Sequence, residues 1–338
     1  MLEIYVIFFT FLITIILNLF SKKKQFLVDK KFSPHKSFAT ENLIPITGGL
    51  IFFISCLFFL SFENQSTKFL LSLIFIVGLL SDTNYLFSPL KRFFFQILSV
   101  IIFVYSDQLF IDSIRITTID NLLDNIYFKY FFTLFCLLIL VNGANFIDGV
   151  NTLLLGYFLT LSAICVIGVE KFDIPFDVQN FKIIIIILII ILIFNFFGKL
   201  LTGDGGAYLI SFIIGYFLID LANSSERVSP YFVACLLWYP AYECFFSIIR
   251  KKITKKSVAD PDNKHLHQLI FMFLKKNLKL KGNFLNTFTG LSINFYNAII
   301  FYFAFHNISQ TKNLIFLIII SLLLYNFAYL YLKKNLKD

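Results

Sequence analysis

The sequence is poor in charge, in proline and in cysteine. Only 14% of its 338 residues are charged, whereas 58% are hydrophobic. A soluble domain has no need of so much apolar surface, so this balance excludes an ordinary soluble protein. The few cysteines all fall inside apolar runs and form no CxxC pair, which excludes a disulfide or metal framework built on thiols. They are Cys56, Cys136, Cys165, Cys235 and Cys244.

Several motifs of soluble enzymes are also missing. There is no GxxxxGK[ST] phosphate loop, no GxGxxG dinucleotide motif, no Ser-His-Asp signature and no candidate cysteine nucleophile. The basic stretches are short and adjoin apolar runs, so they do not indicate binding to nucleic acid. The chemistry therefore has to be sought in residues beside the membrane.

Eleven apolar runs approach or reach the length that crosses a bilayer. In lipid each segment must satisfy its own backbone hydrogen bonds, which favours helices, and the run IIIIILIIILIF lacks the alternation of a barrel strand. The first run is too long for a cleaved signal peptide and lacks a basic start and a small-residue cleavage site. We predict an all-α integral membrane protein of about 11 transmembrane helices, forming one domain over residues 1–338. The runs cover about 3–20, 47–63, 68–81, 90–107, 128–142, 152–169, 180–197, 204–221, 229–249, 289–306 and 313–332.

Basic residues are divided unevenly between the two sides of the predicted membrane. One side holds 22 of the 29 Lys and Arg residues. The positive-inside rule assigns that side to the cytoplasm, which leaves the amino terminus outside and the carboxyl terminus in the cytoplasm. The loops on this side are 21–46, 82–90, 143–151, 198–203 and a basic loop over 250–288.

Four polar residues follow one another at intervals of three where one apolar run ends, in the segment NGANFIDGVN. This spacing predicts that they line one half of a helix end, with Gly149 leaving the backbone accessible beside them. An ionised carboxylate so near hydrocarbon is costly unless it is paired, and a polar helix cap is the structural alternative. The residues are Asn142, Asn145, Asp148 and Asn151.

The segment TGDGGAY places Asp204 between glycines at the start of another run. Helix amino termini favour anions and phosphates, although an aspartate there can also cap its own helix. Asp82 and Asp148 are expected at the same membrane face. Three carboxylates at one face suggest a divalent cation with oxygen ligands, Mg²⁺ before Ca²⁺.

The segment HLH in the basic loop places His265 and His267 two residues apart. This spacing fits an extended loop better than one face of a helix, and it differs from the HExxH zinc motif. Its basic setting favours contact with an anion. Together, the segments predict a cytoplasmic site where a soluble phosphate ester meets a molecule embedded in lipid.

Five motifs carry a resemblance to a known family. IPITGGL, GLLSDTNYLFSPLKRFFFQ, NGANFIDGVNTLLLG, NFFGKLLTGDGGAYLI and PDNKHLHQLI follow in this order. The chain resembles the polyprenyl-phosphate N-acetylhexosamine-1-phosphate transferases, which are related to the muramoyl-pentapeptide transferase, and the short HLHQ form resembles the GlcNAc branch.

The resemblance implies ten or eleven helices in a bacterial inner membrane. It implies transfer of a sugar-1-phosphate from a UDP-sugar to undecaprenyl phosphate with release of UMP, at the start of cell-surface polysaccharide synthesis. Mg²⁺, or Mn²⁺ in its place, is the implied cofactor. A homodimer is one oligomeric state consistent with the chain.

The resemblance also implies site residues. The implied catalytic residues are Asp82, Asp148, His265 and His267, and the implied metal ligands are Asp204 and Asp82. The implied substrate-binding residues are Asn145, Gly149, Asn151, Lys199 and Gly203. The chain departs from the family at Ser81, which replaces the first acid of an Asp-Asp pair, and at Leu201 and Gln268.

Two alternatives accompany this hypothesis. A secondary transporter would bind its substrate near the bilayer midplane, whereas the polar residues here gather at helix ends, with Glu243 as the main unexplained exception. A catalytically impaired relative acting as a scaffold is indicated only by Ser81. The lipid phosphate has a second pKa of roughly 6 and is mostly a dianion at neutral pH, so an acid at position 81 is not needed as a base.

Overall fold

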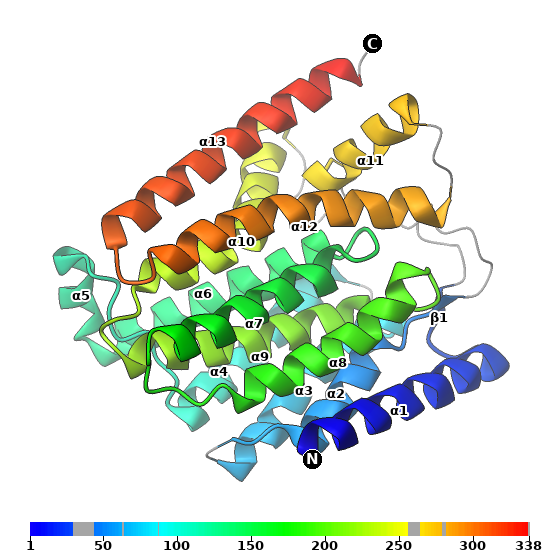
Figure 1. Ribbon diagram of the computed structural model, residues 1–338, viewed down its shortest axis with the longest axis horizontal. Coiled ribbons are helices and arrows are strands. Elements are labelled where there is room, and N and C mark those ends of the chain that lie inside the picture. Colours follow the sequence, from blue (N-terminus) through cyan, green and yellow to red (C-terminus); the bar gives the residue numbers. More distant parts are fainter. Residues whose placement is uncertain (30–43, 63, 87, 256–263, 279–281, 337–338) are drawn as a thin grey trace.

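The computed structural model describes residues 1–29, 44–62, 64–86, 88–255, 264–278 and 282–336. This part of the chain is almost entirely helical, with many helices lying alongside one another (Figure 1). The elements are α1 (Leu2–Lys24), β1 (Val28–Asp29), β2 (Ile44–Pro45), α2 (Gly48–Phe59), α3 (Gln65–Asp82), α4 (Pro89–Asp107), α5 (Thr117–Leu123), α6 (Ile126–Ile147), α7 (Leu153–Lys171), α8 (Gln179–Phe196), α9 (Gly203–Ser224), α10 (Pro230–Ile253), α11 (Leu266–Asn277), α12 (Asn283–His306) and α13 (Thr311–Asn335).

Nine helices in the described part of the chain are long and apolar enough to cross a membrane. They are α1, α4, α6, α7, α8, α9, α10, α12 and α13, and α2 is a shorter apolar helix. Each of the eleven predicted runs coincides with a helix, so the predicted all-α integral membrane fold is confirmed. The number of crossings stays a prediction.

Two short helices were not predicted, α5 and α11. The 12 residues of α11 lie inside the segment 250–288, which we expected to be one basic loop. This segment also contains the last turn of α10 and the start of α12, while 256–263 and 279–281 lie outside the described residues. The many lysines of this segment led us to expect a loop, so α11 was not predicted. Its first turn nevertheless buries Leu266 and Leu269.

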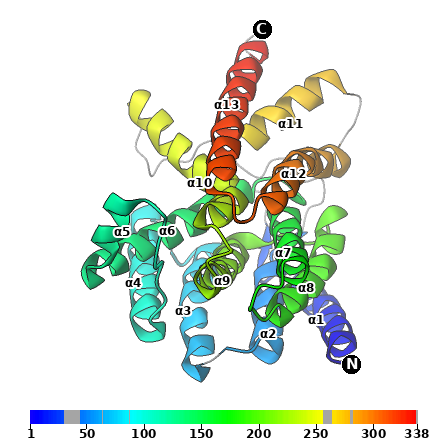
Figure 2. The same ribbon diagram turned by 60° about the vertical axis from the view of Figure 1, so that its left-hand side comes forward.

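The helix α9 lies at the centre of the molecule (Figure 2). It packs against α2, α3, α6, α7 and α10. Of its most apolar window, 83% is buried, compared with 22% for α1 and for α13. A helix that is apolar all round is expected to be surrounded by protein or by lipid, and here the neighbours are other helices.

Glycines allow the amino-terminal end of α9 to approach its neighbours closely. A Cβ atom on Gly78 of α3 would lie 2.4 Å from the Cα atom of Gly205. A Cβ atom on Gly49 of α2 would lie 2.3 Å from the nitrogen of Gly206. Small residues permit this backbone contact between membrane helices. The contact brings Asp82, at the end of α3, to the first turn of α9.

A two-stranded antiparallel sheet covers the same end of the bundle. Asp29 in β1 pairs with Ile44 in β2. The carbonyl of Pro45 accepts a hydrogen bond from the N–H of Leu201 at 2.8 Å, and the N–H of Gly48 donates to the carbonyl of Leu201 at 3.1 Å. These bonds fix the segment that enters α9.

We predict that Gly78→Ala lowers the thermal unfolding midpoint of the purified protein, because the new methyl group overlaps the backbone of Gly205. Overpacking of this kind costs about 1–3 kcal/mol. The matched control is Gly168→Ala in α7, whose Cβ atom would lie 3.5 Å from Ile308, an ordinary contact. A midpoint for Gly78→Ala at or above that of the control would contradict the close packing of α3 and α9.

Candidate active site

The carboxylate of Asp82 caps the amino terminus of α9. Its Oδ1 accepts a hydrogen bond from the N–H of Asp204 at 2.8 Å, and its Oδ2 accepts one from the N–H of Gly205 at 2.9 Å. These are two of the backbone donors that a helix start leaves unpaired. The side chain of the N-cap residue, Thr202, makes no cap hydrogen bond, and the carboxylate of Asp204 bonds to Ser81 and Arg92 instead of to its own helix. The alternative in which Asp204 caps its own helix is therefore wrong.

The carboxylate of Asp204 is bound by Arg92 and Ser81. Arg92 Nη1 lies 2.9 Å from Asp204 Oδ2 and donates to Ser81 Oγ at 2.8 Å, while Ser81 Oγ donates to Asp204 Oδ2 at 2.6 Å. The serine that departs from the family thus completes a hydrogen-bonded triangle. Arg92 was not among the predicted site residues, although it lies within the second motif. The guanidinium compensates the charge of Asp204 in a partly buried setting.

Asp148 lies beyond the end of α6, so the expected polar face of one helix is interrupted. The helix ends at Ile147, and Asp148 follows at the C-cap position. Asn142, at the start of the expected face, donates a hydrogen bond to Gln96 in α4 at 3.1 Å. This bond joins two helices, so Asn142 has a structural role and does not belong to the site. The interval of three holds only while the helix continues, and Asn151 lies past its end.

A hollow of about 530 Å³, including its mouth, opens beside Asp148. It is lined by Asp29, Ile44, Asp148, Gly149, Val150, Asn151, Asn195, Leu201, Thr202, Asn283 and Asn286. Asp148, Gly149 and Asn151 were predicted as site residues. The α8 amide, Asn195, is the first residue of the fourth motif but was not singled out, and Asn283 and Asn286 of α12 lie outside all five motifs. The buried hydroxyl of Thr202 has no hydrogen-bond partner among the described residues.

The His-x-His segment packs against the Asn-x-x-Asp-Gly motif. A Cβ atom on Gly149 would lie 2.1 Å from Nε2 of His267, so only glycine allows this contact. The rings of His265 and His267 are stacked, with centroids 5.7 Å apart and an interplanar angle of 9°. The expected extended loop is correct for His265 alone, because His265 is the N-cap residue of α11 and His267 lies in its first turn. The change of backbone at the cap brings both rings together.

The pKa of His267 is lowered to about 3, chiefly by burial and in smaller part by the neighbouring imidazole of His265, and the carboxylate of Glu243 offsets only part of this. The ring is 1% exposed, and both of its nitrogens are without a hydrogen-bond partner in the described part of the chain. His267 is therefore neutral at physiological pH. A neutral imidazole presents one donor and one acceptor and adds no charge to the site.

The remaining predicted residues lie around these groups. Gly203 has φ +77°, and its Cβ atom would lie 2.7 Å from Asp82 Oδ2, so the position requires glycine. Asn145 is half-buried in the last turn of α6. Lys199 is exposed, with its ammonium 6.0 Å from the ring centroid of Phe197. Asn145 and Lys199 do not line the hollow.

The expected cluster of three carboxylates is not formed. Within the described ranges, no three His, Cys, Asp or Glu side chains are placed to hold a metal ion. Asp82 and Asp204 adjoin each other, but Asp148 faces the hollow instead. Mg²⁺ usually binds one or two carboxylates together with substrate phosphates and water. Asp204 fits that mode, because its side chain is partly exposed and its Oδ1 makes no hydrogen bond to any described residue.

The fold and the site together define an integral membrane protein with a polar site at one end of its helices. Residues 64–222 match the model of glycosyl transferase family 4. This part of the chain is similar to that family, which supports the resemblance that the motifs indicated. The match includes Asp82, Asp148 and Asp204 and ends before the His-x-His segment.

Two curated relatives extend the similarity over most of the chain. The undecaprenyl-phosphate alpha-N-acetylglucosaminyl 1-phosphate transferase of Thermotoga maritima is 26% identical over 269 residues, which cover 77% of this chain and 78% of the relative. A probable undecaprenyl-phosphate N-acetylglucosaminyl 1-phosphate transferase of Bacillus subtilis is 24% identical over 244 residues, 69% of this chain and 67% of the relative.

We predict that the ring of His267 does not titrate between pH 5 and pH 8, because a lowered pKa keeps it neutral throughout this range. Histidine-selective ¹⁵N labelling and nuclear magnetic resonance measure this directly, since the chain has only four histidines. Gly149→Ala should push the ring out of its packing and move its midpoint toward the ordinary value of about 6.5. A wild-type midpoint near 6.5 would contradict the buried placement.

Proposed function

We propose that the chain transfers a sugar-1-phosphate of the N-acetylhexosamine type from a UDP-sugar to undecaprenyl phosphate, with release of UMP. The observation that carries this proposal is the contact of His267 with Gly149 beside Asp148, at the end of the bundle where Asp82 caps α9. Polar groups at helix ends suit a soluble nucleotide that reacts with a phosphate held at the membrane surface. The names of the two relatives support the same reaction.

The two reactants of this proposed reaction are anions, so the site must reduce their repulsion and align them. Asp204 would hold Mg²⁺, which when bound would supply positive charge to the diphosphate. Arg92, next to Asp204, supplies a second fixed cation. Because the lipid phosphate is already mostly ionised at neutral pH, the hydroxyl of Ser81 serves to position Asp204 and no proton acceptor is needed there.

The rest of the site would bind the nucleotide sugar. Asp148 and Asn151 line the hollow where the sugar phosphate would lie, and His267 packs against Gly149 at its edge. Asn145, one turn before Asp148, would contribute from outside the hollow. Gly149 lines the hollow, and Gly203 allows the first turn of α9 to lie against Asp82. Lys199 is exposed, and its charge would attract the nucleotide from solution.

The site would face the cytoplasm of a bacterial inner membrane, where UDP-sugars are dissolved. Basic residues occupy the last turns of α1, α10 and α13, as the positive-inside rule requires for helices that end in the cytoplasm. This orientation places the amino terminus outside and the carboxyl terminus inside. The product would begin a cell-surface polysaccharide.

The direct test is an assay for UMP release by the purified protein, with a panel of UDP-sugars and with or without undecaprenyl phosphate and Mg²⁺. The proposal expects UMP only when both the lipid phosphate and one N-acetylhexosamine donor are present. Absence of UMP under every combination would favour the scaffold alternative. Release of UMP without the lipid would indicate a hydrolase.

We predict that Asp204→Asn lowers turnover at least about 100-fold, equivalent to about 2.7 kcal/mol of barrier, because the amide cannot hold Mg²⁺ as a carboxylate does. The asparagine oxygen can still accept from Arg92, so the fold should persist. Asp112→Asn is the matched control, since Asp112 pairs with Lys129 on an exposed surface at 3.1 Å. Near-normal turnover of Asp204→Asn at low Mg²⁺ would show that Asp204 does not hold the metal ion.

A further inference from the structure

A buried carboxylate, Glu243, lies in α10 outside the groups assigned above. Its side chain is 1% exposed. An ionisable group inside a membrane helix is costly unless it is paired, and such groups commonly have a functional partner. The proposed reaction does not use Glu243, and neither its helix nor its position links it to the motifs in sequence.

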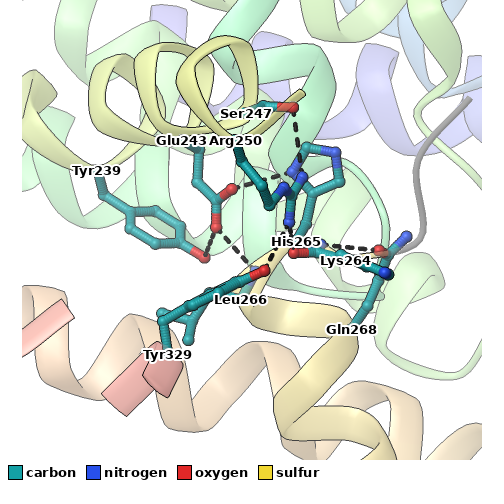
Figure 3. Close-up of polar contacts among 9 residues, drawn as sticks. All are labelled: Tyr239, Glu243, Ser247, Arg250, Lys264, His265, Leu266, Gln268 and Tyr329. Atoms are coloured by element: carbon teal, nitrogen blue, oxygen red, sulfur yellow. Dashed lines mark hydrogen bonds and ion pairs between the residues drawn. The ribbon is translucent and has the colours of Figure 1, made fainter. Parts of the chain in front are cut away.

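Both oxygens of Glu243 bind the His-x-His segment (Figure 3). Oε2 lies 3.0 Å from Nδ1 of His265, and Oε1 accepts a hydrogen bond from the N–H of Leu266 at 3.1 Å. The hydroxyl of Tyr239 also donates to Oε1, at 3.5 Å. The carboxylate therefore joins α10 to the start of α11.

Arg250 provides a second attachment on the same face of α10. It follows Glu243 by seven residues, which is about two helical turns. Its Nη1 donates to the carbonyl of Lys264 and to the hydroxyl of Tyr329 in α13 at 3.0 Å, and its Nη2 lies 3.4 Å from Ser247 Oγ (Figure 3). The backbone just before His267 is thus fixed from α10 at two points.

The bond from Glu243 determines where the proton of His265 lies. An ionised carboxylate only accepts hydrogen bonds, so Nδ1 of His265 must carry a proton. In the neutral ring, Nε2 then keeps its lone pair. No described residue forms a hydrogen bond with His265 Nε2. In other enzymes, a carboxylate orients a catalytic histidine and fixes its tautomer in this way.

A carboxylate is also the group that this position requires. Its partners in the His-x-His segment, His265 Nδ1 and the N–H of Leu266, both act as donors, as does the hydroxyl of Tyr239. A glutamine has one oxygen, and the backbone N–H cannot change its role. In Glu243→Gln the oxygen would therefore remain on Leu266, and the amide N–H would donate to Nδ1, which forces the proton of His265 onto Nε2.

We propose that Glu243 is a positioning residue that holds His265 in the tautomer with its proton on Nδ1 and fixes the His-x-His turn against Gly149. The inference rests on the proposed function in one respect, namely that this turn serves the transferase site. Its structural content, the tautomer and the placement of the ring, can be measured without turnover.

The first measurement is the ring ¹⁵N spectrum of His265 in the wild-type protein and in Glu243→Gln. The wild type should show a protonated Nδ1 and Glu243→Gln a protonated Nε2, while Glu243→Asp, which keeps both acceptors, should retain the wild-type tautomer. Glu170→Gln is the control, since Glu170 pairs with Lys182 at the protein surface at 2.7 Å. An unchanged tautomer in Glu243→Gln would overturn the proposal.

The second measurement is turnover. Glu243→Gln should lower kcat at least tenfold with KM for the UDP-sugar within about twofold, and Glu243→Asp should recover part of the loss. In a His265→Gln background, Glu243→Gln should have little further effect, because the glutamate acts through the histidine. Independent, additive losses would overturn this role, as would a loss of rate explained by a lower thermal midpoint.

The two proposals fail separately. If the wild-type protein releases no UMP with any donor, the proposed function fails, and the ¹⁵N measurement still decides the role of Glu243 at His265. If UMP is released normally by Glu243→Gln, the proposed function stands and the positioning role is wrong.

Discussion

The start of α9 is the point on which the rest of the site depends. A helix start carries unpaired N–H groups, and the start of α9 lies at one end of the bundle but is enclosed by neighbouring helices, so those groups need acceptors from the protein. Asp82 supplies them from α3. This requirement explains the glycines that bring α2 and α3 against α9, and the bonds that hold the segment entering α9. It also sets the position of Asp204, which Arg92 binds in turn.

The buried and partly buried carboxylates of this apolar molecule are each bound by donors from another helix. Asp82 binds helix amides, Asp204 binds Arg92, and Glu243 binds His265. Glu243 was the main exception to the gathering of polar residues at helix ends, and it was therefore the residue that best fitted a transporter. Its bonds to the His-x-His turn assign it to the same end of the molecule as the other polar groups, which removes the main argument for a transporter.

The sequence predicted the helices well and the contacts between them poorly. Apolar runs determine where helices lie in lipid, so all eleven runs were found, whereas α11 was hidden by its lysines. The family resemblance assigned Asp148, Gly149 and the two histidines to one site, and in the structure Gly149 lies against His267. Periodicity could not show that Asp82 caps a helix 122 residues away, that Arg92 binds Asp204, or that α6 ends before Asp148. Those contacts depend on the packing of distant helices.

The central claim is that phosphorus moves together with the sugar, and one isotope measurement tests it. UDP-N-acetylglucosamine labelled with ³²P at the β-phosphate is incubated with the purified protein, undecaprenyl phosphate and Mg²⁺, and the lipid is extracted into organic solvent. Our account predicts that the label enters the lipid fraction and that the released UMP is unlabelled. Label that stays in the aqueous phase as UDP, while unlabelled sugar enters the lipid, would contradict it.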